Sequence, residues 1–173
     1  MANKLKIAFG ILIYIFALNG CGIYNFSGTN IDYDKVKYIL IHPVENQALK
    51  VNPALSNTLT DALNDQYRRL TKLQLVTDDS LKELLELSCV VTSYDIKPIA
   101  VTADEYASKN RLTITVKIQF TNHTAPDENI EQSFSSYDDY DAMTALESVE
   151  AGLVENIIKT LVGDIFNATV AQW

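Results

Sequence analysis

Residues that carry chemistry are scarce in this sequence of 173 residues, which has two cysteines, two histidines and one tryptophan. His42 and His123 stand outside any metal-ligand spacing, and the cysteines do not form a zinc-binding pair. The G-x-S-x-G nucleophile motif and a glycine-rich phosphate loop are also absent from the sequence. Cys89 lies within an apolar segment, where a buried structural cysteine is expected. We therefore expect neither an enzyme nor a cofactor-dependent protein.

Glycine, proline and basic residues are few as well. Six glycines and four prolines are spread too thinly to mark a linker between domains, and no repeat or low-complexity segment occurs. The 14 basic side chains face 22 acidic ones, which gives a net charge of −8. Nucleic-acid binding rests on neutralising phosphates with Lys and Arg, so this balance excludes it as the main function. The composition predicts one acidic domain.

The first part of the chain has its own composition. Lys4 and Lys6 are the only charged residues before Asp32, and an apolar run over residues 7–17 follows them. A basic start followed by a short apolar run is typical of a secretory signal. The run is shorter than the roughly 20 residues that cross a bilayer. The alternatives are a retained signal anchor and a buried N-terminal helix.

The end of this leader resembles a bacterial lipobox, in the sequence Leu18-Asn19-Gly20-Cys21. Asn19 is less usual than Ala or Ser at its place. Cleavage there makes Cys21 the new N-terminus, where covalently attached acyl chains hold the protein to a membrane. Cys89 is then the only thiol left, which excludes an internal disulfide. Gly22, in place of the Asp that retains lipoproteins in the inner membrane, favours the periplasmic face of the outer membrane. Without Lys4 and Lys6, the net charge changes from −8 to −10.

Hydrophobic periodicity predicts the elements of the remaining chain. Short strands are expected over residues 36–42 and 71–77, and a helix between them starts at Asn52-Pro53, with Asn52 as its N-cap. Residues 81–87 are compatible with a helix or a strand, and a strand is favoured there and over residues 88–96. Apolar and polar residues alternate strictly over residues 111–121, which predicts a strand with one buried and one solvent-exposed face. Residues 130–137 are expected to form its antiparallel partner strand. Thr144 and Glu147 form a capping box for a long helix that ends near Trp173.

These elements predict an α+β fold. We expect a two-layer sandwich in the order β-α-β-β-β-β-α, with a mostly antiparallel sheet of about four or five strands and two helices on one face. Residues 1–20 form the signal peptide, residues 21–34 the lipidated N-terminus and tether, and residues 35–173 the single domain.

A sparse row of cations is the main candidate for ligand binding. Lys109, Arg111 and Lys117 share the polar parity of the best strand and span about 26 Å at roughly 3.3 Å per residue. Lys97 lies nearby in sequence, in a turn before Pro98. Such a row could hold phosphate groups by charge-assisted hydrogen bonds. The alternative is an ordinary solvent-exposed strand face, on which the charged side chains bind no ligand and only favour solubility.

A cluster of carboxylates, Asp138, Asp139 and Asp141, could suggest a calcium site. It lacks the glycine and the terminal glutamate of an EF-hand loop. We therefore expect a solvated turn there and no metal site.

Several short motifs follow one another along the mature chain: Gly22-Ile23-Tyr24, Phe26-Ser27-Gly28, Val51-Asn52-Pro53, Leu55-Ser56, Asn110-Arg111-Leu112-Thr113-Ile114-Thr115-Val116, Phe120-Thr121-Asn122, Gln132-Ser133-Phe134-Ser135, Tyr137, Tyr140 and Asp164-Ile165-Phe166-Asn167. In this order, and together with the lipobox, they resemble the LptE family of outer-membrane lipopolysaccharide-assembly lipoproteins, in its Bacteroidetes form. The resemblance covers nearly all of the mature chain.

This resemblance implies a non-catalytic plug inside the lumen of an LptD-type β-barrel, where it supports barrel assembly and contacts lipopolysaccharide. Lys109, Arg111, Lys117 and Lys97 become candidates for lipopolysaccharide binding, although no family motif transfers onto them. The net charge of −10 argues against capture of the anionic lipopolysaccharide by the overall electrostatic field of the protein. Two other classes remain open: a free-standing periplasmic lipoprotein that binds glycan or lipid, and a lipid-anchored hydrolase.

Overall fold

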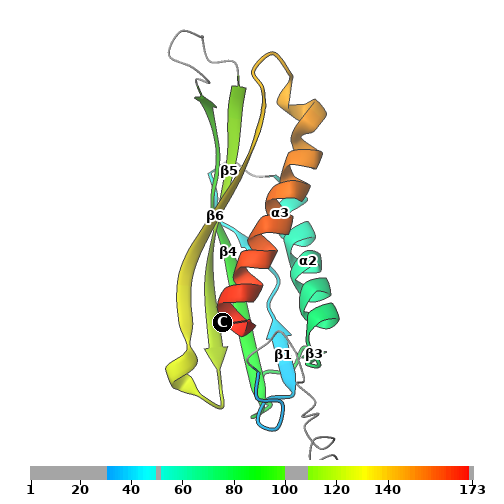
Figure 1. The fold of residues 1–173 in the computed structure, drawn as a ribbon, viewed down its shortest axis with the longest axis vertical. Helices are drawn as coiled ribbons and strands as arrows, with labels where there is room; N and C mark the ends of the chain where they lie inside the picture. The colour runs from blue at the N-terminus through cyan, green and yellow to red at the C-terminus, as the bar shows by residue number, and fades with distance from the viewer. Residues whose placement is uncertain (1–30, 50–51, 100–108, 172–173) are drawn as a thin grey trace, which may run out of the picture.

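The computed structural model describes residues 31–49, 52–99 and 109–171. Along the chain, its elements are β1 (Tyr38–Ile41), β2 (Glu45–Asn46), α2 (Leu55–Leu70), β3 (Gln74–Val76), β4 (Leu84–Ile99), β5 (Lys109–Asn122), the 3-10 turn η1 (Pro126–Glu128), β6 (Ile130–Asp141) and α3 (Leu146–Val170). The sheet forms one layer and both helices cover one of its faces (Figure 1). The predicted α+β fold and the order of its main elements are confirmed.

Within the described residues, the sheet has six strands and is mixed. Its order is β3-β1-β4-β5-β6, and β2 also pairs with β4. β1 runs parallel to β3 and β4, whereas β4, β5 and β6 form a long antiparallel meander. The expectation of a mostly antiparallel sheet is confirmed, because the meander holds most of the paired residues, and the short parallel strands make the sheet mixed. The parallel part follows from α2, because a helix that connects two strands of one sheet brings the second strand back in the same direction.

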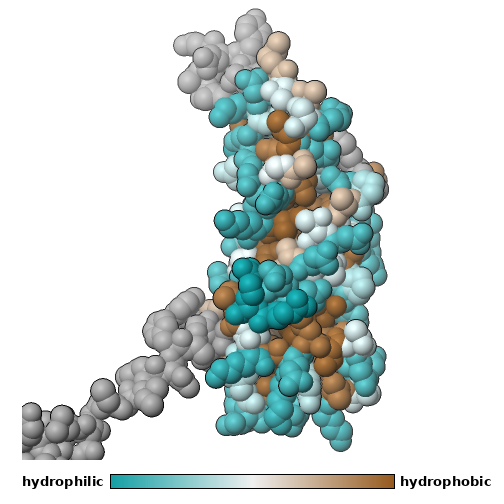
Figure 2. Space-filling model, turned by 90° about the vertical axis from the view of Figure 1, so that its right-hand side faces the viewer, coloured by the Kyte–Doolittle hydropathy of each residue, from teal (hydrophilic) through white to brown (hydrophobic). Residues whose placement is uncertain are grey.

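The core lies between the helices and the sheet. β5 buries Leu112, Ile114 and Val116 toward the helices, as the alternation predicts. α3 buries a stripe made of Leu153, Val154, Ile157, Ile158, Leu161, Val162, Ile165 and Phe166. Seen from the helix side, hydrophobic residues show between hydrophilic ones along the length of the molecule (Figure 2).

Tyr67 of α2 joins the two helices inside this core. Its ring meets Phe166 edge-on, with 5.2 Å between ring centroids. Its hydroxyl forms a 2.5 Å hydrogen bond with Oγ1 of Thr169, which also donates to the Ile165 carbonyl. Burial raises the pKa of Tyr67, so the group stays neutral. Cys89 is buried in the sheet as predicted, and burial raises the pKa of its thiol to about 12.

Both helix starts differ from the predicted caps. Asn52 does accept a hydrogen bond from the Ala54 amide, at 3.0 Å, but the N-cap is Ala54 and Asn52 stabilises the preceding turn. The capping box at Thr144 is wrong. The N-cap of α3 is Ala145, because the Thr144 amide donates to the Asp141 carbonyl and closes the turn between β6 and α3.

Two strands are longer than the sequence predicts. β4 starts at Leu84, which confirms the strand for most of the ambiguous segment, and runs to Ile99, so Lys97 lies in a strand and not in a turn. β6 continues to Asp141, so Asp138, Asp139 and Asp141 belong to a strand and not to a solvated turn. In both cases pairing with β5 extends the strand past residues of low strand propensity.

Candidate functional site

The candidate cations lie on the face of the sheet that the helices leave open. Residues opposite one another in antiparallel strands share a face. Lys97 on β4 is the register partner of Arg111 on β5, and Asp139 on β6 stands on the other side of Arg111. Lys109 lies two residues before Arg111 and belongs to the same face. We call Lys97, Lys109 and Arg111 the basic tip.

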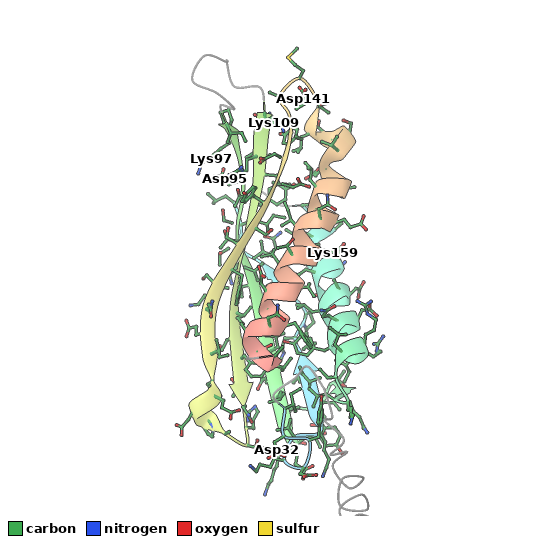
Figure 3. All side chains as sticks on the ribbon, in the orientation of Figure 1. Asp32, Asp95, Lys97, Lys109, Asp141 and Lys159 are labelled. Atoms are coloured by element: carbon green, nitrogen blue, oxygen red, sulfur yellow. The ribbon has the colours of Figure 1, made fainter. Side chains whose placement is uncertain are left out.

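The structure divides the predicted row. Lys117 lies six residues beyond Arg111 along β5, about 20 Å away at roughly 3.3 Å per residue. Lys97 and Lys109 lie near one end of the long axis, whereas Asp32 lies near the other end (Figure 3). The predicted row is thus three cations gathered at one end of the sheet and a fourth, separate one.

Most of these cations already have a carboxylate partner. Nε and Nη2 of Arg111 donate to the two oxygens of Asp139, at 2.7 and 2.9 Å. Lys97 lies 2.7 Å from a carboxylate oxygen of Asp95. Lys117 forms an ion pair with Glu131. The hydrogen bonds to these cations lower the pKa values of Asp139, Asp95 and Glu131. A bound anion would have to share or displace these carboxylates.

Two features keep the basic tip available to an anion. The Arg111 guanidinium lies over the Tyr137 ring, 3.6 Å from its centroid, which fixes its plane. Arg has five N–H donors, and among the described residues Asp139 takes two of those of Arg111, which leaves three for an anion. Lys109 is exposed and forms no ion pair with any residue in the described ranges.

The two histidines meet on one carboxylate, which sequence reasoning missed. Nε2 of His42 lies 2.7 Å from Oε1 of Glu86, and Nε2 of His123 lies 2.9 Å from its Oε2. These hydrogen bonds lower the pKa of Glu86. These two hydrogen bonds form a bridge on Glu86. The bridge connects the residues that follow β1 and β5 to β4, the middle strand of the sheet. Within the described residues, no group of three or more His, Cys, Asp or Glu side chains is arranged to hold a metal ion.

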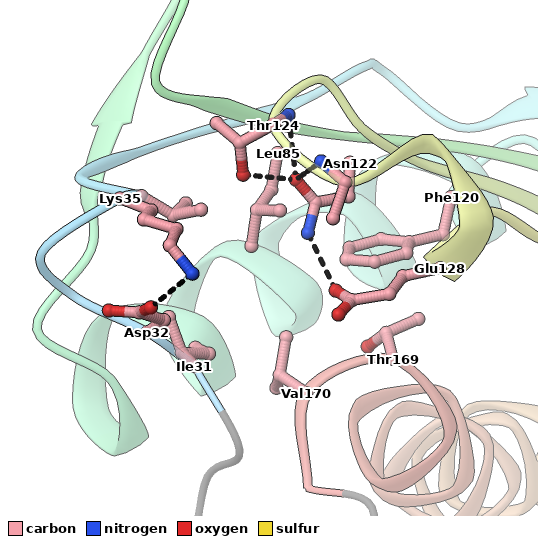
Figure 4. A pocket seen from close by; sticks show the side chains of 12 residues that line it. Ile31, Asp32, Lys35, Leu85, Phe120, Asn122, Thr124, Glu128, Thr169 and Val170 are labelled. Carbon is pink, nitrogen blue, oxygen red and sulfur yellow. Dashed lines mark hydrogen bonds and ion pairs between the residues drawn. The ribbon is translucent and has the colours of Figure 1, made fainter.

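A small pocket opens at the end of the molecule opposite the basic tip. Its volume is about 160 Å³, and Ile31, Leu85, Phe120 and Val170 give it apolar walls (Figure 4). Its polar groups are paired with one another: Lys35 with Asp32 at 2.9 Å, and the Asn122 amide with Glu128 at 2.8 Å. It shows no unpaired charge that would select a ligand.

The predicted lipidation site, Cys21, lies outside the described residues. The described chain begins at Ile31, which lines the pocket. None of the helices in the described ranges is long and apolar enough to cross a membrane.

Comparisons with known proteins agree with this architecture. The model of the LptE family, described as lipopolysaccharide-assembly, matches residues 36–169. No curated protein sequence matches the chain. Among solved structures, uncharacterized lipoprotein B from Nitrosomonas europaea has 14% sequence identity and a TM-score of 0.51, over 75% of this chain and 79% of that chain. This likeness supports the fold.

Two other solved lipoproteins are similar over comparable lengths. Rare lipoprotein B from Shewanella oneidensis has 13% identity and a TM-score of 0.49, over 75% of this chain and 89% of that chain. A minor lipoprotein from Acinetobacter baumannii has 17% identity and a TM-score of 0.47, over 73% of this chain and 87% of that chain.

Proposed function

Because the chain belongs to the LptE family of lipopolysaccharide-assembly proteins, we propose that it is a non-catalytic lipoprotein of the outer membrane. In this role it plugs an LptD-type β-barrel, supports the assembly of that barrel, and takes part in moving lipopolysaccharide to the outer leaflet. The observation that carries the proposal is the family match over residues 36–169, which spans the sheet and both helices.

The long axis of the domain suits a plug. β4 has 16 residues, which at roughly 3.3 Å each gives about 53 Å, more than the ~30 Å hydrocarbon core of a bilayer. The described chain begins near one end of the long axis, where Asp32 lies, and the basic tip lies at the other end (Figure 3). With Cys21 lipidated in the periplasmic leaflet, the domain can extend into a barrel lumen with the basic tip directed away from the anchor.

The basic tip supplies the chemistry for contact with lipopolysaccharide. Lipid A carries phosphates, and cations bind phosphate oxygens through short, charge-assisted hydrogen bonds. Lys109 and the free donors of Arg111 are ready for such bonds, whereas Lys97 must first release Asp95. Lys117 is too far from the other three to bind the same phosphate, so we assign it no part in this contact.

Depletion of the protein tests the assembly role. The folded form of the barrel partner should fall in step with the lipoprotein, and surface lipopolysaccharide should fall with it. If folded barrel and surface lipopolysaccharide both stay unchanged after depletion, the proposal is wrong.

A further inference from the structure

The outer edge of β6 is a long strand edge without a neighbour among the described residues. β6 has 12 residues and pairs with β5 alone, at the end of the strand order. The Asp139 amide donates to the Asp138 side chain, at 2.9 Å. Because amides alternate in direction along a strand, this places the odd-numbered amides of β6, including those of Ser133, Ser135 and Tyr137, on the outer edge.

The middle of this edge, residues 132–137, lacks the features that usually protect an exposed strand, which are bulges, Pro and charged side chains, and the strand is not short. Its register with β5 runs without a shift from Ile130 to Asp141, and it contains neither Pro nor Lys. The upper part of β4 provides the contrast. Beyond Val91 it also lacks a described neighbour on one side, but it has a bulge at Thr92 and carries Lys97 and Pro98.

The charges on β6 decide which occupant fits the edge. Its middle part, residues 132–137, is uncharged, and carboxylates stand at both ends. A second copy of the chain could place its own β6 antiparallel to this edge. In the two registers that pair the most residues, Glu131 of one copy lies opposite Asp139 or Asp141 of the other. Like charges in directly opposed positions destabilise a strand pair. A strand with Lys or Arg opposite Asp139 and Asp141 has the complementary charge.

We propose that the outer edge of β6 pairs with an extended segment of the barrel partner that carries basic residues opposite Asp139 and Asp141. This inference rests on the proposed function for the identity of the partner. The wall strands of a closed barrel already pair on both sides, so the segment belongs to a loop or an extension of the barrel protein. Main-chain hydrogen bonds supply the affinity in such strand addition, and side chains supply the specificity.

Hydrogen–deuterium exchange with residue resolution tests the pairing directly in the purified complex and in the isolated protein. The amides of Ser133, Ser135 and Tyr137 should exchange at least about tenfold more slowly in the complex. The amides of Phe134 and Ser136, which face β5, should be protected in both samples. Fast exchange of the three odd-numbered amides in a stable complex overturns the edge pairing and leaves the proposed function intact. Failure to form any complex overturns both.

Variants of Ser133, an exposed position, add a second test. Ser133→Pro removes one outward N–H and should weaken the complex about tenfold, whereas Ser133→Thr keeps the N–H and should stay within about twofold. Equal affinities for the two variants overturn the proposal. If Ser133→Pro does not fold, the exchange measurement on the unchanged protein decides. Protection of the edge that grows with concentration in the isolated protein points to a second copy and also overturns the proposal.

Charge complementarity has its own matched pair of variants. Asp139→Asn with Asp141→Asn keeps an amide oxygen at each position, which can still accept from Nε of Arg111 and from the Met143 amide, but removes two charges. Asp61→Asn with Asp164→Asn removes two charges from exposed helix positions. The first pair should weaken the complex about three- to tenfold at low salt, and less at high salt, while the second pair has little effect. Equal effects contradict a basic segment at this edge.

Discussion

Arg111 and Asp139 face each other across β5 and β6, joined by two hydrogen bonds of 2.7 and 2.9 Å. The pair is partly shielded, with side-chain exposures of 34% and 25%, whereas Lys117 and Glu131 on the same strands are 51% and 63% exposed. Two parallel bonds fix a guanidinium more firmly than a single ammonium contact. This two-bond Arg111–Asp139 pair, which we call the fork, therefore sets the geometry of the basic tip.

Replacement of this fork should cost stability. Arg111→Lys loses one of the two bonds and the stacking on Tyr137, and should lower the free energy of unfolding by about 0.5–1 kcal/mol. Thermal melting should show a midpoint lower by roughly 1–4 °C for a chain of this size. Lys117→Ala is the control, since the exposed pair it removes contributes little. A larger loss in Lys117→Ala than in Arg111→Lys would contradict the assignment.

The bridge on Glu86 should make stability depend on acid. The folded protein holds the pKa of Glu86 below its ordinary value of 4.5, through hydrogen bonds from His123 and His42. A depressed pKa contributes stability above the unfolded value, and that contribution is lost as the pH falls from about 4.5 through the lower, folded pKa. Urea unfolding between pH 6 and pH 3, at about half-unit steps, should give a steeper loss for the natural protein than for Glu86→Gln. Identical slopes would exclude the bridge as a source of acid sensitivity.

Lipopolysaccharide binding should depend on the position of the cations. Lys97→Ala with Lys109→Ala should weaken binding of purified protein to fluorescently labelled lipopolysaccharide by about tenfold. Lys35→Ala with Lys117→Ala removes the same charge away from the basic tip and should change binding by no more than about twofold. Equal losses in the two double variants would show that total charge, not the basic tip, controls binding.

Lipidation should depend on Cys21 alone. Cys21→Ala should abolish palmitate labelling and leave the leader uncleaved, because the acyl chains are attached to this sulfur. Cys89→Ala, which removes the buried thiol, should keep the label. Palmitate on the Cys21→Ala protein would show that the lipobox interpretation is wrong.

The sequence predicted those features that depend on local periodicity. The alternation of Leu112, Ile114 and Val116 defined β5 and its buried face, and the apolar stripe of the last helix defined α3. Features that depend on long-range pairing were missed. Glu86 lies 44 and 37 positions from its two histidine partners, so only the strand order brings them together. The fork to Asp139 required the register of β5 with β6, and a count across the intervening turn could have suggested it.

The role as a barrel plug is tested most directly by a gentle detergent pull-down of the C-terminally tagged protein, followed by mass spectrometry of the proteins that accompany it. A large outer-membrane β-barrel of the LptD type should accompany the protein in stoichiometric amount. Recovery of the lipoprotein alone, with its acyl chains intact, would contradict the role as a plug and would favour a free-standing lipoprotein that binds glycan or lipid.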